Sequence, residues 1–371
     1  MRVFIVYASA GAGHFRCAEA IYDFLKENHP EIDTELIDIL GKSNIFFRFS
    51  YGWGYHFLVN QAIFLWQWAY QLTYFWPLRR FTRIIACIIN RINTRNFSRF
   101  LTQENPDFII STHFLSSEVT ANLNSQAKIK SKIMSVITDF GIHPFWICPG
   151  TDLYVVATGL TKDLLVKEGV EEEVIKDLGI PVHPKFLRQY AKDELCKELG
   201  IDKNKFTILI TTGSFGVGPI EAIVDALYKE VQILVVCANN QRLYKKLKNK
   251  NYEDVFVFGF VNNVEELMSV SDLIITKPGG LSISELLIKE LVPIFIHPIP
   301  GQETTNARIL EKYGIGVTAK NVGDVKNTVL DYKGHPEKLS KIKENIKKIK
   351  KPNATEGLLN AVCQSGIGDT G

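Results

Sequence analysis

The chain lacks the cysteine patterns of secreted and zinc-binding proteins. Its six cysteines, among 371 residues, form no CxxC pair and show no Cys/His spacing that fits a zinc site. Residues 1–8, MRVFIVYA, lead directly into a folded pattern, without the charged leader, long apolar core and cleavage site of a signal peptide. We therefore expect a reducing, cytoplasmic setting, with no disulfide framework and no bound metal.

The chain also has little net charge. It holds 43 Lys and Arg residues against 40 Asp and Glu residues, a formal net charge of +3. This balance excludes a bulk polyelectrolyte role, so we expect no nucleic-acid partner. Hydrophobic residues make up 46% of the chain, as in globular proteins, and the length suits two domains.

Acidic residues are absent from one long stretch. Residues 39–103 contain no Asp or Glu, and between Arg48 and Arg79 only His56 could carry a charge. Four of the five tryptophans lie here, and the later part of the stretch is rich in arginine. Large aromatic side chains beside clustered cations favour the headgroup zone of an anionic bilayer. The residues that we expect at the membrane are Trp53, Trp66, Trp68, Trp76, Arg79, Arg80 and Arg83.

Two other interpretations of this stretch stay open. The aromatic side chains would also suit an ordinary protein core, and an apolar helix here could span a bilayer. Asn60, Gln61, Gln67 and Gln71 interrupt the most apolar window, which argues against a spanning helix. We favour a monotopic segment over 43–100 that docks on an anionic membrane surface, where each arginine contributes about 1 kcal/mol. The basic run 338–351 is either a solvated helix face or a second lipid contact.

Short apolar runs alternate with helical patterns along the whole chain. Such runs predict parallel strands that are covered on both faces of a sheet. The predicted strands include DFIIST (107–112), KIMSVITD (132–139), DLYVVAT (152–158), VQILVVC (231–237), DVFVFGF (254–260), DLIITKPGG (272–280) and VPIFIHP (292–298). The pattern predicts an α/β protein made of two Rossmann-like domains that face each other across a cleft.

The two halves open in the same way. Residues 5–27 and 208–230 both show a buried strand, a Gly/Ser turn and a helix whose apolar face keeps one phase. A proline-rich connector at 179–186, GIPVHPKF, predicts the break between domains. We expect an N-terminal domain at 1–185, a C-terminal domain at 186–350, and a helix and tail at 351–371. Ligands of open α/β sheets bind beyond the carboxyl ends of the strands, so both turns should contribute to binding.

The second half carries a further phosphate-binding pattern. In TKPGGLSISELL a strand ends at Thr276, glycines follow, and a helix begins, so that its N–H groups could bind a phosphate. Glu285 lies on this helix, where it is either a plain exposed acid or an acceptor for two ribose hydroxyls. After a Pro-Gly turn, Gln302, Glu303 and Asn306 come together in PGQETTNA, a set that suits sugar hydroxyls.

These motifs, in this order, resemble those of the monogalactosyldiacylglycerol synthases and the bacterial processive diacylglycerol glucosyltransferases. Both are GT-B-fold enzymes related to the N-acetylglucosaminyltransferase of peptidoglycan synthesis. The resemblance covers roughly 1–320. It rests on GAGH…AEAI (11–21), ITDFGIHPFW (137–146), GIPV (179–182), GSFGVG (213–218), GFVNNVEELMSVSDLIITKPGGLSISE (259–285) and PGQETTNA (300–307).

The resemblance implies an inverting transfer of a hexose from a UDP-sugar to the hydroxyl of diacylglycerol at a membrane surface. The first half would receive the lipid and the second half would bind UDP-glucose or UDP-galactose, with no cofactor and no metal held by a DxD motif, which the sequence does not offer. The enzyme would then lie on the cytoplasmic side of the membrane as a peripheral protein. The donor-binding residues that it implies are Gly213, Ser214, Gly216, Phe260, Val261, Gly279, Gly280, Leu281, Glu285, Gln302, Glu303 and Asn306.

We expect His14 to be the base that this reaction needs. The acceptor hydroxyl is a poor nucleophile unless a base removes its proton, and a histidine with an ordinary pKa near 6.5 suits that task. Gly11 and Gly13 would leave room for the acceptor. Asp139, at a strand end, either orients His14 or replaces it as the base, and His143 would lie on the acceptor side. A plain capping role for His14 stays open.

Other activities fit the motifs less well. A serine hydrolase needs GxSxG, and TGSFG lacks the first glycine at the right place. A dinucleotide oxidoreductase needs GxGxxG, which GAGHFRC breaks at the third glycine. A UDP-sugar epimerase of the same fold, or a transferase with a polyprenyl-linked or other lipid acceptor, remains the alternative. The sequence does not decide between glucose and galactose.

Overall fold

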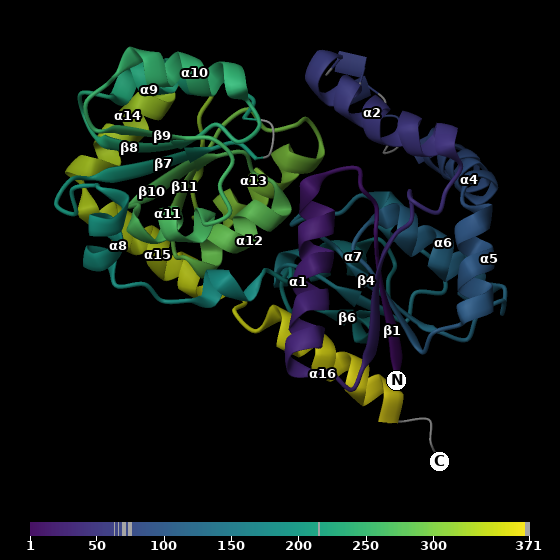
Figure 1. The fold of residues 1–371 in the computed structure, drawn as a ribbon. Helices are drawn as coiled ribbons and strands as arrows, with labels where there is room; N and C mark the ends of the chain where they lie inside the picture. Colours follow the sequence, from purple (N-terminus) through teal and green to yellow (C-terminus); the bar gives the residue numbers. More distant parts are fainter. Residues whose placement is uncertain (63, 66, 69–71, 73–75, 214–215, 368–371) are drawn as a thin grey trace. The chain divides into compact units, whose positions relative to one another are not determined.

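The computed structural model describes residues 1–371 except 63, 66, 69–71, 73–75, 214–215 and 368–371. The chain divides into two compact units, each built on one six-stranded parallel sheet (Figure 1). The first unit comprises Met1–Pro184, Ile299–Thr305 and Lys351–Gly371, and the second comprises Lys185–Pro298 and Asn306–Lys350. The final helix and the short segment before residue 306 therefore group with the first unit.

The first unit has the strand order β2-β1-β3-β4-β5-β6. Its inner strands are continuous apolar runs, and all four residues of β3 are buried, as expected for a sheet that is covered on both faces. The strands are β1 (Arg2–Tyr7), β2 (Asp33–Asp38), β3 (Phe108–Ser111), β4 (Lys132–Val136), β5 (Leu153–Val155) and β6 (Ile175–Lys176). The chain passes from β1 to β2 on one side and to β3 on the other, so the strand order reverses between β1 and β3.

Helices connect these strands. They are α1 (Ala12–Asn28), α2 (Ile45–Gln61), α4 (Trp76–Asn93), α5 (Arg95–Glu104), α6 (Phe114–Ser125), η1 (Pro144–Trp146), α7 (Gly159–Lys167), η2 (Glu172–Val174) and α16 (Ala354–Ile367). Helices α4, α5 and α6 pack against one another, and α16 packs against α1 (Figure 1). In the described part of the chain, no helix is both long enough and apolar enough to cross a membrane.

The second unit has the strand order β12-β11-β10-β7-β8-β9, which reverses between β7 and β10. Its strands are β7 (Thr207–Thr211), β8 (Gln232–Val236), β9 (Val255–Phe258), β10 (Leu273–Thr276), β11 (Val292–Phe295) and β12 (Val317–Thr318). Its helices are η3 (Pro184–Leu187), α8 (Lys192–Leu199), α9 (Ile220–Leu227), α10 (Gln241–Lys250), α11 (Val264–Val270), α12 (Gly280–Ile288), α13 (Gln302–Lys312), α14 (Val322–Gly334) and α15 (Pro336–Ile349). Two of them cross the unit boundary: η3 starts one residue before it, and α13 begins in the segment that groups with the first unit.

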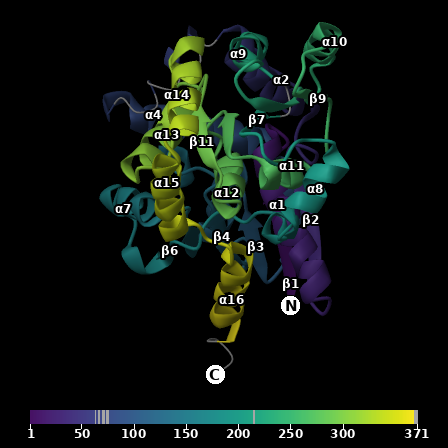
Figure 2. The same ribbon diagram turned by 90° about the vertical axis from the view of Figure 1, so that its left-hand side faces the viewer.

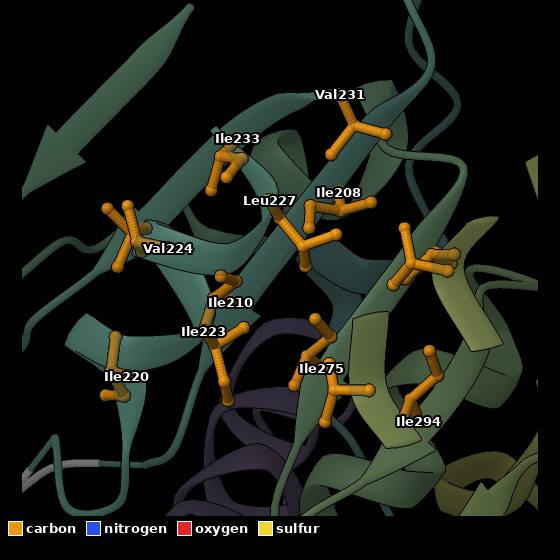
Figure 3. Close-up of a cluster of buried hydrophobic side chains, with 14 of the residues drawn as sticks. Ile208, Ile210, Ile220, Ile223, Val224, Leu227, Val231, Ile233, Ile275 and Ile294 are labelled. Carbon is orange, nitrogen blue, oxygen red and sulfur yellow. The ribbon is translucent and has the colours of Figure 1, made fainter. Parts of the chain in front are cut away.

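The second unit's core lies between the sheet and its helices. Helices α9 and α14 pack together on one face, whereas α11 and α12 lie on the other side of the sheet (Figure 2). Figure 3 shows α9 side chains over those of the strands, including Ile223 beside Ile210. Both of these residues are fully buried, and each such side chain contributes about 1.5–3 kcal/mol to the hydrophobic free energy of folding.

The predicted α/β class and the two Rossmann-like halves are confirmed. Every predicted strand is present, although most end a few residues earlier than the apolar runs suggested. The two openings differ in one respect that the aligned patterns did not show. Helix α1 begins five residues after β1 ends, whereas α9 begins nine residues after β7 ends, because a longer turn separates Thr211 from Ile220.

Candidate active site

His14 lies where the strand order of the first unit reverses. Helix α1 begins at Ala12, after the short turn that follows β1, so His14 is in the first helical turn. Gly11 is the N-cap residue, and no side chain caps this helix. The capping interpretation of His14 therefore finds no support, because its imidazole makes its hydrogen bonds elsewhere.

The imidazole of His14 is held by residues that follow β3 and β4. Its Nδ1 atom lies 2.8 Å from the carbonyl oxygen of Thr112 and 2.8 Å from the hydroxyl oxygen of Thr138. A carbonyl oxygen only accepts hydrogen bonds, so Nδ1 carries the proton. Thr112 also donates its hydroxyl to the His14 carbonyl, at 2.9 Å. The neutral tautomer therefore keeps a lone pair on Nε2, which is the atom that a general base uses.

Burial lowers the pKa of His14, and the nearby Asp139 carboxylate and the hydrogen bond to the Thr112 carbonyl act in the opposite direction. The net shift is downward from the ordinary value of 6.5, so the imidazole is neutral and basic at neutral pH. Burial is the largest of these three influences on the pKa of His14.

A second histidine contacts the first. The His113 ring meets the His14 ring edge to face, with 4.5 Å between centroids. His113 is only 2% exposed, and its Nδ1 accepts a hydrogen bond from the Leu115 amide at 3.0 Å, which caps α6. Burial, together with His14, lowers the pKa of His113 well below its ordinary value. The His113 imidazole is therefore neutral at neutral pH, and its hydrogen bond to Leu115 fixes it against the His14 ring.

Asp139 and His143 follow β4, and the Asp139 carboxylate is close enough to act on His14 through its charge. Asp139 is 7% exposed, and its Oδ2 accepts a hydrogen bond from the Gln302 side chain at 2.7 Å. Both of these residues belong to the first unit, because 299–305 groups with it. His143 caps the short helix η1, since its Nδ1 accepts from the Phe145 amide at 3.2 Å. Asp139 thus acts on His14 through charge, while it also holds Gln302.

Glu303 and Asn306, which were expected near the transferred sugar, bond to backbone groups. Glu303 accepts from the Ile299 amide at 2.7 Å, which fixes the turn before α13. Asn306 is fully buried and donates to the carbonyl of Pro278 at 3.1 Å, which ties α13 to the glycine turn after β10. In this structure both side chains support the loops of the site.

The turn after β7 has two kinds of glycine. Gly216 has φ 54°, and a Cβ there would lie 2.5 Å from the Cys237 carbonyl oxygen, so packing demands a glycine. Gly213 has φ 76°, but a side chain there would meet open space. Ser214 lies outside the described residues. The hydroxyl of Thr212, 5% exposed, has no hydrogen-bond partner among the described residues.

The turn after β10 leads into α12. No side chain caps the backbone N–H groups at the start of this helix. Gly279 is the N-cap residue and makes no side-chain hydrogen bond, and Gly280 and Leu281 form the first turn. Glu285 is partly exposed in the second turn of this helix. After β9, Phe260 is 54% exposed and Val261 is partly exposed. All these residues follow the carboxyl ends of parallel strands, where α/β sheets bind ligands.

The aromatic segment is only partly described. Trp68 is 60% exposed, whereas Trp66 lies outside the described residues, as do the side chains of Trp53, Trp76, Arg79 and Arg80. Arg83 is partly buried and donates to the carbonyl of Ile147, so the protein itself holds this guanidinium.

Sequence reasoning missed four residues of these sites, namely Thr112, Thr138, His113 and Thr212. Each of them follows a predicted strand within two residues of its end in the structure. Carboxyl ends of parallel strands meet at one edge of a sheet, so that position was the signal that could have identified them.

Comparison with known proteins gives the same architecture. MurG of Acinetobacter baumannii covers 98% of this chain and 99% of its own at 15% identity, with a TM-score of 0.58. UDP-GlcNAc 2-epimerase of Neisseria meningitidis, solved with UDP-GlcNAc, covers 98% and 100% at 14% identity, with a TM-score of 0.61. At such identities the likeness concerns the fold, and it places the chain among proteins with the GT-B architecture.

The family matches are more specific. Residues 14–182 match the family model described as Monogalactosyldiacylglycerol (MGDG) synthase, and residues 207–357 match the Glycosyltransferase family 28 C-terminal domain. The earlier part of the chain therefore matches an MGDG synthase domain and the later part matches a glycosyltransferase family 28 C-terminal domain, as the motifs predicted.

Curated relatives extend over almost the whole chain. A processive diacylglycerol beta-glucosyltransferase of Bacillus cereus (strain G9842) is 29% identical over 367 residues, which is 97% of this chain and 93% of the relative. The enzyme of the same name from Bacillus pumilus (strain SAFR-032) is 29% identical over 370 residues, or 98% and 94%.

Proposed function

We propose that this protein transfers a hexose from a UDP-sugar to the hydroxyl of diacylglycerol with inversion at the sugar. One observation carries the assignment of the chemistry to the first unit. His14 is held at the reversal of the strand order with Nδ1 as a donor, so its Nε2 lone pair is available to a substrate hydroxyl. The two family matches and the curated diacylglycerol glucosyltransferases support the substrate class.

The proposed step is a direct displacement. The acceptor oxygen forms a bond to the anomeric carbon while the bond from that carbon to the UDP oxygen breaks, and its electron pair leaves with UDP. The proton of the acceptor hydroxyl passes to Nε2 of His14. A neutral imidazole is required for this step, and the lowered pKa of His14 provides it at neutral pH.

The second unit is the proposed donor site. The uncapped amides at the start of α12 and the turn after β7 would bind the diphosphate, because helix N-termini carry free N–H donors and positive potential. Glu285, one turn further along α12, would accept the ribose hydroxyls. Charge stabilisation by these backbone donors would replace a metal ion, so we expect transfer to continue in the presence of a chelator.

Access to a lipid acceptor requires a membrane-facing surface, and α4 offers one. Six apolar side chains recur along this helix with helical spacing, and each is between 41% and 61% exposed. We call them the α4 stripe: Phe81, Ile84, Ile85, Ile88, Ile89 and Ile92. An exposed apolar row of this kind, beside arginines, is typical of a helix that lies in the bilayer interface, here on the cytoplasmic side.

The membrane proposal has its own test. An Ile85→Asp, Ile88→Asp variant should lose about ten-fold or more of its affinity for phosphatidylglycerol vesicles, since each buried isoleucine contributes about 1.5–3 kcal/mol. Val166→Asp is the matched control, because Val166 is also exposed but lies on α7. Sedimentation with vesicles measures both, and equal binding of the two variants would contradict docking through α4.

The transfer itself is tested with radiolabelled UDP-glucose and UDP-galactose, each incubated with diacylglycerol vesicles, with and without a chelator. The proposal predicts a labelled lipid that co-migrates with a glycosyldiacylglycerol on thin-layer plates, and one donor should be preferred. Label recovered as the epimer of the sugar nucleotide would favour the epimerase alternative, and label that stays in the unchanged sugar nucleotide would contradict the proposed transfer.

A further inference from the structure

Helices α4, α5 and α6 of the first unit enclose a pocket of about 700 Å³. Figure 1 shows the three helices side by side. The residues that line the pocket include none of the His14 site, so it is a separate feature. Among the described residues that line it are four cations, Arg91, Arg95, Arg99 and Lys128, and one carboxylate, Glu118.

The three arginines form a row along one wall. They are spaced four residues apart across the junction between α4 and α5. The junction keeps helical hydrogen bonds, because the Thr94 amide donates to Asn90 and the Ser98 amide donates to Thr94, each at 2.9 Å. Thr94 interrupts the helix, but Arg95 and Arg99 lie on one side of α5, and all three arginines line the same pocket.

This row of like charges is suited to a phosphate. The arginines are exposed, and no Asp or Glu occurs between residues 39 and 103 to neutralise them locally. Like charges four residues apart repel one another, and a bound anion would relieve that repulsion. The planar guanidinium fork also matches phosphate oxygens in pairs, which an ammonium group does not.

The opposite wall, on α6, has a different chemistry. Glu118 accepts a hydrogen bond from Asn90 at 3.1 Å through Oε2, while its Oε1 is buried and has no hydrogen-bond partner among the described residues. Burial raises the pKa of Glu118. Asn122 and Gln126 line the same wall. The amides and the carboxyl group of this wall are of the kinds that bind ligand hydroxyl groups.

The pocket adjoins the α4 stripe. Ile88 and Ile92 belong both to the stripe and to the pocket lining. A ligand that places a phosphate among the arginines would therefore have apolar side chains next to it. This combination fits a lipid, with its headgroup in the pocket and its chains along the stripe.

We propose that this pocket binds the headgroup of an anionic phospholipid, with the phosphate on the Arg91–Arg95–Arg99 row and headgroup hydroxyls on the Glu118 wall. The proposal rests on the membrane docking proposed above and names the lipid contact within it. It predicts that the protein prefers phosphatidylglycerol, which has headgroup hydroxyls, over phosphatidic acid, which has none.

Water-soluble dihexanoyl-phosphatidylglycerol tests the pocket without a membrane. Calorimetric titration of the full chain should show saturable binding, which an Arg95→Gln, Arg99→Gln variant weakens by about 25-fold, or five-fold for each arginine. Arg99→Lys should restore only part of the loss of Arg99→Gln, because lysine keeps the charge but not the fork. Lys130→Gln and Lys167→Gln remove exposed cations that do not line the pocket, and they should bind as the wild type does.

Competition by inorganic phosphate, competition by glycerol phosphate and a Glu118→Gln variant identify the ligand class. Inorganic phosphate and glycerol phosphate should compete weakly, since they lack acyl chains; competition as strong as that of the short-chain lipid would overturn a lipid site. Glu118→Gln should lose the preference for phosphatidylglycerol over dihexanoyl-phosphatidic acid. Equal binding by wild type and the double arginine variant would overturn the proposal.

Binding of the short-chain lipid to the pocket can be measured independently of the transfer reaction. His14→Ala should bind the short-chain lipid like the wild type, since binding needs neither donor nor base. Hexose transfer without pocket-specific lipid binding would overturn the pocket alone, and lipid binding without transfer would count against the proposed function alone.

Discussion

In both units the strand order reverses beside the first strand, but the helices that follow the neighbouring strand, β3 or β10, begin differently. In the first unit, the helix after the neighbouring strand β3 is capped by His113, whose imidazole accepts from the Leu115 amide. In the second, the equivalent helix α12 begins at Gly279 and has no side-chain cap. The protein itself caps the start of α6, whereas the start of α12 has no side-chain cap, as our proposed anion-binding role for its N–H groups requires.

The same contrast holds for the turns. The first unit places a titratable side chain, His14, at the reversal and fixes it with Thr112 and Thr138. The second unit places glycines there, and Gly213 faces open space. This difference is the basis on which we propose two tasks for similar topologies: proton transfer in the first unit and binding of a charged donor in the second.

The largest effect should come from removing the base. His14→Ala should lower kcat by about 10²–10⁴, the usual range for loss of a general base. Calorimetric UDP binding should be unchanged, because the proposed donor site lies in the second unit. His29→Ala, at the other end of α1, is the control and should keep full activity. A His14→Ala enzyme that retains most of its kcat would assign the base to another group.

A change in the proposed donor site should affect KM for the UDP-sugar and leave kcat nearly unchanged, the opposite of the His14 variant. Glu285→Ala should raise the KM for the UDP-sugar by about 10–100-fold, since hydrogen bonds to a charged group contribute about 1.5–3 kcal/mol. Its kcat should change little. Steady-state kinetics with Glu253→Ala, an exposed acid of the same unit, as the control will show the effect. Unchanged donor kinetics would return Glu285 to a solvated helix face.

Gly11 and Gly216 allow an effect on substrate binding to be distinguished from an effect on packing. Gly11 has an extended backbone, and a Cβ there meets nothing within 4 Å, so Gly11→Ala should leave thermal unfolding unchanged. If the acceptor uses that space, the added methyl should reduce kcat/KM for the lipid by about ten-fold.

Gly216→Ala should do the reverse and lower the free energy of unfolding by about 1–3 kcal/mol, because of its left-handed backbone and the close Cys237 carbonyl. Thermal unfolding of both glycine variants measures the contrast. An unfolding temperature that falls in Gly11→Ala but not in Gly216→Ala would reverse these assignments.

Asp139→Asn should have the smallest effect, less than about ten-fold in kcat at neutral pH. The Asp139 carboxylate raises the pKa of His14, so its removal should move the acid limb of the pH profile to lower pH. The double variant with His14→Ala should be little slower than His14→Ala alone, because the two groups act as one unit. Loss of activity in Asp139→Asn that exceeds the loss in His14→Ala would make the aspartate the base.

Much of this comparison was predictable from local patterns. The strands are apolar runs because both faces of each sheet are covered, and the glycine turns are visible in the sequence. The contact of His14 with Thr112 was not predictable, because it depends on β1 and β3 being neighbours, a pairing of residues 98 positions apart. The packing role of Gly216 and the bond between Gln302 and Asp139 depend in the same way on distant segments.

The pH dependence of kcat/KM, measured for the wild type and His14→Ala together with UDP affinity at each pH, tests the division of tasks most directly. Burial lowers the pKa of His14, so the wild-type profile should lose activity only as the pH falls below about 6.5, where the imidazole gains a proton. That limb should be absent in His14→Ala, while the UDP affinities of the two proteins stay equal. The same acid limb in both enzymes would contradict His14 as the base and, with it, the assignment of proton transfer to the first unit.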